Sequence, residues 1–103
     1  MGDRGNIIVK DMGSEVYLYT HGTGSYLPET LKRALARKQR WDDGPYLARI
    51  IFCEMIKGSE ADETGFGISS KRGDGGTDIT VNVDDQTVSR NGKKTVSFAE
   101  YIQ

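Results

Sequence analysis

The chain has 103 residues, of which 36% are hydrophobic, a size and composition that predict one domain (residues 1–103) with a single core. Its 14 Lys and Arg residues nearly balance its 15 Asp and Glu residues, so no overall field favours nucleic acid or an anionic membrane as a partner. The single cysteine excludes an internal disulfide, and no apolar run has the length of a leader or a membrane span, so we expect a cytoplasmic protein.

A β-hairpin is predicted at the start of the chain. Gly13-Ser14 suits a type II′ turn, which would pair Met12 with Glu15. The flanking β-rich runs are residues 6–12 and 15–21. One face of the hairpin is apolar and is the expected core face, with Ile7, Val9, Val16 and Leu18. The opposite face is unusually aromatic for a solvated surface and carries Ile8, Tyr17, Tyr19 and His21.

An amphipathic helix is predicted to follow, with Pro28 in its first turn and its end at about Arg40. Its apolar positions recur at helical spacing: Leu27, Leu31, Ala34 and Leu35. On such a helix three basic residues fall within one narrow sector, namely Arg33, Arg37 and Arg40. This stripe has two interpretations, a solvated face or a surface that binds a partner or a phosphate.

A second helix is predicted over residues 46–57, after an N-cap at Asp42 or Asp43 and before Gly58. Apolar residues surround nearly its whole circumference, which is typical of a helix at the centre of a core. We therefore expect Cys53 to be a buried, inert thiol. Trp41 is expected to pack at the junction between the two helices.

Arg49 and Glu54 interrupt the apolar sequence of this second helix. Five residues separate them, so they lie about 140° apart and do not pair with each other. One interpretation gives each a structural ion pair, with Asp42, Asp43 or Asp78 as candidate partners. In the other interpretation Arg49 presents its guanidinium group to a ligand anion.

The sequence of the C-terminal half predicts mainly β-structure. Strands are predicted at residues 66–70 and 78–83, and turns at Asp74-Gly75-Gly76 and Asn91-Gly92. A four-residue connection would set Val83 opposite Val88, and Ser97 to Glu100 has the spacing of a capping box before a terminal turn. The predicted fold class is α+β in two layers, with an antiparallel sheet of about five strands packed on two helices in the order ββααβββ.

No catalytic set, metal site or cofactor is predicted. The chain has one histidine, His21, and one cysteine, Cys53, on elements of different character, whereas nucleophilic catalysis and zinc binding each need a clustered set of side chains. Pairs such as Asp84-Asp85 are explained first by turn chemistry.

The loop before the first helix is the strongest candidate for a ligand site. A helix N-terminus leaves N–H groups free and attracts anions, and glycines let the backbone approach them closely. The residues of this site would be His21, Gly22, Thr23, Gly24 and Ser25, with Tyr17 and Tyr19 as stacking groups. A capped helix with a flexible connection explains the same loop without a ligand.

Several short segments of the sequence resemble those of a group of small prokaryotic and phage-encoded proteins without an assigned activity. They are Tyr19-Thr20-His21, Leu27-Pro28-Glu29-Thr30-Leu31, Arg40-Trp41-Asp42-Asp43, Tyr46-Leu47-Ala48-Arg49-Ile50-Ile51-Phe52 and Thr64-Gly65-Phe66-Gly67-Ile68-Ser69. The resemblance implies a prokaryotic or viral setting and brings no site residues with it.

From these features we expect a non-enzymatic binding protein, such as an accessory or anti-defence factor of a phage or mobile element. Its partner would be a host protein or a small anionic, nucleotide-like ligand, and a homo-oligomer is compatible with the sequence. The alternative is a small enzyme that acts on a phosphorylated or nucleotide substrate, with His21 as the acid or base.

Overall fold

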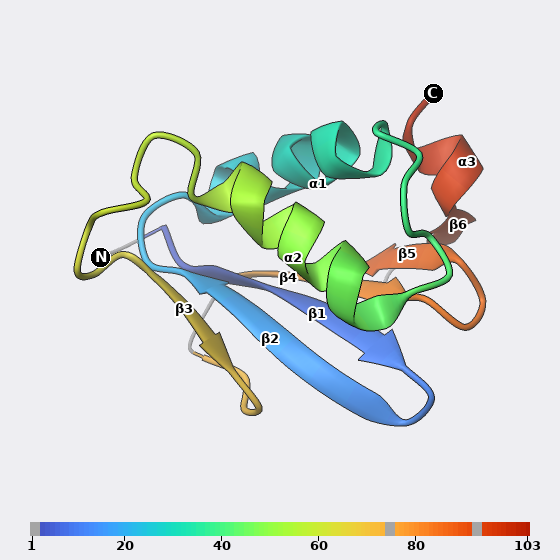
Figure 1. Cartoon of the computed structure of the whole chain (residues 1–103), viewed down its shortest axis with the longest axis horizontal. Helices are drawn as coiled ribbons and strands as arrows, with labels where there is room; N and C mark the ends of the chain where they lie inside the picture. Colours follow the sequence, from blue (N-terminus) through green and yellow to red (C-terminus); the bar gives the residue numbers. More distant parts are fainter. Residues whose placement is uncertain (1–2, 74–75, 92–93) are drawn as a thin grey trace.

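The computed structural model describes residues 3–73, 76–91 and 94–103. Within these ranges, helices cover one face of a six-stranded sheet with strand order β3-β2-β1-β4-β5-β6 (Figure 1). The strands are β1 (Gly5–Asp11), β2 (Ser14–Thr20), β3 (Phe66–Ser69), β4 (Thr77–Asn82), β5 (Thr87–Arg90) and β6 (Thr95–Ser97). The helices are α1 (Leu27–Leu35), α2 (Gly44–Met55) and α3 (Phe98–Tyr101), with a 3₁₀ turn η1 (Gly24–Tyr26) before α1. The α+β class is as predicted.

The sheet is mixed rather than antiparallel, which corrects the prediction. β4 runs parallel to β1, while every other neighbouring pair is antiparallel. β3 adds to the outer side of β2, so β4 takes the free side of β1. The structure also has β6 and α3, which the predicted order lacks, although the capping box of Ser97 and Glu100 is confirmed. The predicted turn residues Asp74, Gly75 and Gly92 lie outside the described ranges.

The first hairpin turns one residue earlier than predicted, which shifts the pairing of its strands by two residues. Met12 and Gly13 occupy the turn with φ of 50° and 86°, the conformation of a type I′ turn rather than type II′. Lys10 therefore pairs with Glu15. Positive φ at both central residues matches the twist of the flanking strands, which is why this turn replaces the one expected at Gly13-Ser14.

The second predicted hairpin shows the same shift, because Val88 pairs with Val81 and not with Val83. Side chains alternate with a period of two along a strand, so a shift of two residues leaves every side chain on its predicted face. The helix-facing side of the sheet accordingly holds the expected apolar residues, including Ile7, Val9, Leu18, Ile79 and Val81.

Helix α1 ends at Leu35, earlier than the predicted Arg40. The indole N–H of Trp41 donates at 3.1 Å to the Leu35 carbonyl oxygen, which also accepts from the Lys38 N–H at 3.0 Å, so the connection folds back onto the last turn of α1. The Trp41 ring also meets Phe98 edge-on, with 5.5 Å between ring centroids. Trp41 thus packs at the junction of the helices, as predicted.

Helix α2 begins at Gly44, and the predicted cap is confirmed because the Asp43 carboxylate accepts from the Tyr46 N–H at 3.2 Å. The helix is not buried all round. Leu47 and Ile51 face the core, whereas Arg49 and Cys53 are exposed. The prediction of a buried Cys53 is therefore wrong, because the sheet and α1 cover only the inner side of α2.

Candidate anion-binding site

The inner side of α2 carries a buried carboxylate at the interface with α1. Glu54 is 6% exposed and forms ion pairs with Arg33 at 3.5 Å, with Lys57 at 3.4 Å and with Arg37. Burial disfavours the charged carboxylate, but the hydrogen bond from Arg37 and the charge of Lys57 outweigh it and lower the pKa of Glu54. A structural ion pair is predicted for Glu54, but its partners are Arg33 on α1, Arg37 just after α1 and Lys57 just after α2.

Arg49, on the outer side of α2, has no ion pair with any described residue. Two of the acids proposed for it, Asp43 and Asp78, are engaged elsewhere. Asp43 caps α2 and lies 4.0 Å from Arg40, and Asp78 is paired with Arg72 at 3.0 Å. The structural ion pair predicted for Arg49 is therefore wrong, and its guanidinium group is available to a ligand.

Arg49 borders a concavity of about 650 Å³ between α2 and the α1–α2 connection. Its lining contains three arginines and no carboxylate: Arg37, Gln39, Arg40, Tyr46, Arg49 and Ile50. The sequence placed Arg37 and Arg40 on a helical stripe with Arg33, which is wrong because α1 stops at Leu35. The fold instead unites those two arginines with Arg49, while Arg33 is held at Glu54.

A flat aromatic group completes this arginine pocket. The Arg40 guanidinium carbon lies 4.8 Å from the centre of the Tyr46 ring, and Tyr46 is 54% exposed. This cation–π contact keeps the Arg40 charge at the mouth of the concavity. Such an arrangement can bind an anion through its guanidinium groups and a planar group on the exposed surface of the Arg40–Tyr46 pair.

The backbone that carries Arg40 has an unusual conformation. Lys38 and Arg40 have φ of 56° and 59°, in the left-handed region that costs a non-glycine residue about 1 kcal/mol. The other non-glycine residues with positive φ, among those described, belong to connections between strands: Met12, Gln86 and Asn91. Backbone strain of this kind is often found at functional sites, and here it lies in the connection that lines the arginine pocket.

The loop predicted as an anion site is filled by the chain itself. Both carboxylate oxygens of Asp3 accept from the Ser25 N–H at 3.0 Å, and the Asp3 carbonyl accepts from the Gly24 N–H at 2.6 Å. The hydrogen bonds from Ser25 lower the pKa of Asp3, which keeps this carboxylate ionised. The N–H groups proposed for a phosphate at Gly24 and Ser25 are therefore already in use.

Most of the remaining residues of that predicted site form hydrogen bonds with nearby side chains. Thr23 shares a hydrogen bond with Thr20 at 2.6 Å between hydroxyl oxygens, and the Tyr19 hydroxyl lies 3.1 Å from His21 Nδ1. Tyr17 donates to Glu15 at 2.8 Å, and Gly22 is exposed. None of these residues lines the arginine pocket, so the fold does not join them with Arg49.

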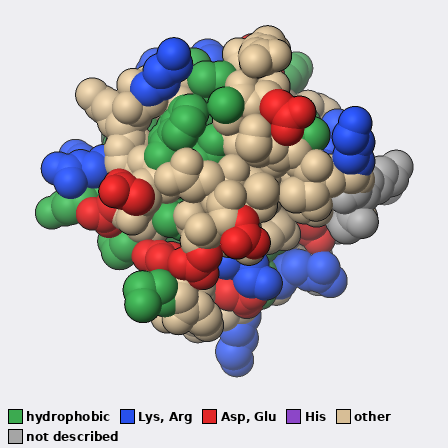
Figure 2. Space-filling model, turned by 90° about the vertical axis from the view of Figure 1, so that its right-hand side faces the viewer, with side chains coloured by type: hydrophobic (Ala, Val, Ile, Leu, Met, Phe, Trp, Pro, Cys, Tyr) green, Lys and Arg blue, Asp and Glu red, His purple; other side chains and the backbone are tan. Residues whose placement is uncertain are grey.

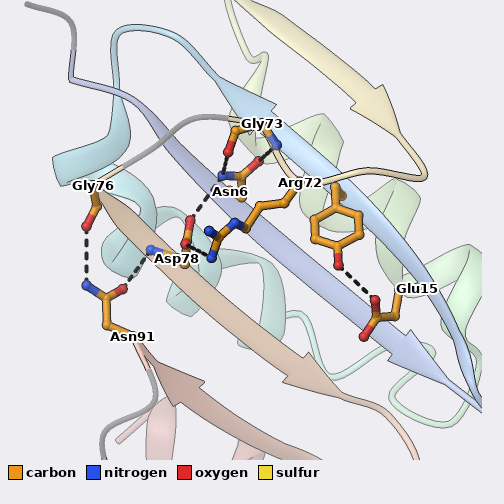
Figure 3. A network of polar contacts seen from close by, with 8 residues as sticks. Asn6, Glu15, Arg72, Gly73, Gly76, Asp78 and Asn91 are labelled. Atoms are coloured by element: carbon orange, nitrogen blue, oxygen red, sulfur yellow. Dashed lines mark hydrogen bonds and ion pairs between the residues drawn. The ribbon is translucent and has the colours of Figure 1, made fainter.

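A polar network lies on the face of the sheet that carries no helix (Figure 3). The Asn6 side chain is buried and donates to Gly73 O at 2.8 Å and to Asp78 Oδ1 at 3.0 Å. Arg72 also donates to Asp78, and Asn91 Oδ1 accepts from the Asp78 N–H at 2.7 Å. Because its members satisfy one another, the network holds the segment after β3 against β1 and β4.

The side of the molecule with α3 and the α1–α2 connection shows apolar areas, the most extensive in its upper half, among acidic and basic groups (Figure 2). A further concavity there includes Trp41, Ala99 and Ile102. Its mixed lining offers no single chemistry comparable to that of the arginine pocket.

No protein family, curated protein or solved structure matches the chain. In the described ranges, no group of three or more metal-binding side chains is present. None of the helices described has the length and apolar character required to cross a bilayer.

Proposed function

We propose that the protein is a non-enzymatic binding protein that captures a small anionic, nucleotide-like ligand in the arginine pocket. The convergence of Arg37, Arg40 and Arg49 around one concavity without a lining carboxylate carries the proposal. Like charges gathered in one place repel each other, so such a cluster favours an anion that neutralises it.

The three guanidinium groups differ in how far they are already engaged. Arg37 is bonded to Glu54. Arg40 lies 4.0 Å from the Asp43 carboxylate and forms a cation–π contact with the Tyr46 ring. Arg49 has no acid partner among the residues that the structure describes. We therefore assign Arg49 the main contact with the anion, through two parallel N–H donors.

The volume and the aromatic component indicate a ligand larger than a bare phosphate. About 650 Å³ lies within the range of pockets that hold nucleotide-sized molecules. A base would stack on the Arg40–Tyr46 pair while Arg49 and Arg37 hold the phosphate. Inorganic phosphate would gain the charge contacts without the stacking.

Calorimetric titration tests the proposal with ADP, GDP, a cyclic dinucleotide and inorganic phosphate as probes. We expect at least one nucleotide to bind more tightly than phosphate. Arg49→Gln should weaken that binding about tenfold or more, because a charge-assisted hydrogen bond contributes roughly 1.4 kcal/mol or more.

Arg90→Gln is the matched control, since Arg90 is exposed on β5 and does not line the pocket. It removes the same charge and should leave the affinity nearly unchanged. Equal losses in both variants would mean that the protein attracts anions only by its general charge. Absence of binding by every probe at millimolar concentration would contradict the proposal.

A further inference from the structure

Strand β3 forms one edge of the sheet and pairs only with β2 among the described strands (Figure 1). The His21 N–H donates to the Gly65 carbonyl at 2.8 Å, which fixes the alternation of hydrogen bonds between the two strands. In an antiparallel pair, alternate residues bond to the neighbouring strand. The backbone N–H and C=O groups of Gly67 and Ser69 therefore point toward β2. Those of Phe66 and Ile68 point to the open side of β3.

The side chains of this edge are apolar on the helix side of the sheet. Phe66 and Ile68 lie opposite Thr20 and Leu18, whose side chains face the helices. Ile68 is 62% exposed and borders a groove of about 520 Å³ on the outer flank of α2. An exposed edge with a large apolar side chain attracts another strand.

The opposite edge of the sheet is protected in ways that β3 is not. β6 has three residues, follows Lys94 and runs directly into α3. Short length, lysine and a covering element are the usual means by which proteins block edge pairing. β3 contains neither a charged residue nor proline, so its open side is free to pair.

We propose that β3 pairs with the β3 of a second copy of this chain, antiparallel across a two-fold axis. Outward N–H and C=O groups bond only to outward groups of the other copy, and the register in which Phe66 of one copy lies opposite Ile68 of the other pairs both outward residues of β3 within the two strands. Gly67 then faces Gly67 at the axis. Each exposed Ile68 packs on a Phe66 ring, and the two sheets become one continuous sheet.

The charges beside β3 support a second copy as the partner. Acidic residues precede the strand, at Asp62 and Glu63, and Lys71 follows it. Antiparallel pairing in this register places the start of one β3, which follows Glu63, beside the end of the other, which precedes Lys71. Antiparallel self-pairing thus brings opposite charges together twice, whereas parallel pairing would bring like charges together.

Sedimentation velocity over a concentration series tests the dimer in solution. We expect a reversible dimer, which Ile68→Lys weakens at least tenfold. Met12→Lys is the control, because it adds the same charge at an 86% exposed apolar residue in the β1–β2 turn.

Glu63→Lys and Lys71→Glu should each weaken the dimer, and the double exchange should restore it. A wild-type protein that stays monomeric at millimolar concentration would overturn the proposal and leave this edge to a strand of another protein.

A disulfide trap in a Cys53→Ser background tests the register. Gly67→Cys should cross-link on mild oxidation, because residues opposite each other at the axis have Cα atoms about 4.5 Å apart. A Cβ atom at Gly67 meets no atom within 4 Å, so the substitution leaves the fold intact. Ser69→Cys on the same face is the control, since its counterpart would lie ~13 Å away. Rapid cross-linking of Gly67→Cys alone supports the pairing. Equal cross-linking of both variants, or of neither, would contradict it.

Discussion

Glu54 and Arg49 lie on opposite sides of α2 and have opposite electrostatic surroundings. Glu54 is buried among three cationic side chains, whereas Arg49 is exposed beside two further arginines and has no acid partner in the described structure. Arg37 belongs to both sites, because it bonds Glu54 and lines the arginine pocket. One helix thus separates a charge that stabilises the fold from a charge that is free to bind.

Removal of the buried Glu54 carboxylate should destabilise the protein more than any other change considered below. Glu54→Ala should lower the free energy of unfolding by about 2–3 kcal/mol, because it deletes hydrogen bonds to charged groups and leaves like charges together. Arg49→Ala should change it by less than about 0.5 kcal/mol, as is usual for an exposed residue. Urea unfolding measures both values, and equal losses would remove the distinction between the two sides.

The stability of the protein should depend on pH through Glu54 and not through Arg49. The pKa of Glu54 in the folded protein lies below its ordinary value of 4.5, so folding favours the ionised carboxylate. Its contribution to stability is complete above pH 4.5 and is lost as the pH falls through the lower, folded pKa. Glu54→Gln should therefore lose stability at neutral pH and approach the wild type in acid. A constant difference between the two proteins across this range would contradict the pKa direction.

Glu54→Gln also tests whether the two sites compete for Arg37. The neutral amide holds Arg37 less strongly, so a nucleotide that binds wild type should bind this variant several-fold more tightly, despite the weaker fold. Calorimetry with the nucleotide that binds wild type measures the change. Weaker binding would show that Glu54 positions Arg37 for the ligand and does not compete with it.

The sequence predicted the parts of this contrast that depend on local pattern. The core face of the first hairpin, the Asp43 cap and the packing of Trp41 follow from side-chain period and capping chemistry. Glu54 was recognised as a charge that needs a partner. Its actual partners depend on the packing of α1 on α2, which no local pattern specifies.

The parts that the sequence missed are set by tertiary contacts. The apolar pattern of α2 indicated burial all round, but only a covering element on each side would bury Cys53, and α2 has an open flank. The glycine loop had the composition of an anion site, but Asp3 folds back onto it from the start of the chain. The parallel pairing of β1 with β4 joins segments about 70 residues apart.

A smaller effect is expected from the strained connection that supports the binding side. Arg40→Gly should stabilise the fold by up to about 1 kcal/mol, because glycine adopts a φ of 59° without steric cost, yet it should weaken nucleotide binding. Lys38→Gly relieves the same kind of strain at a φ of 56° and keeps all three arginines of the pocket. It should gain similar stability with unchanged affinity. Equal binding by the two variants would show that Arg40 takes no part in the site.

The smallest effect is expected at Cys53, on the same exposed side of α2 as Arg49. Cys53→Ser should change the free energy of unfolding by less than about 0.5 kcal/mol, because an exposed thiol loses little contact with the core. The native thiol should react with a labelling reagent at a rate close to that of the unfolded chain, since solvent reaches it without opening of the helix. Cys53 also borders the groove next to Ile68, so the rate should fall at high protein concentration if pairing of β3 covers that flank. Slow labelling at every concentration would show that the outer side of α2 is covered within one chain, and would remove the difference between the two sides of the helix.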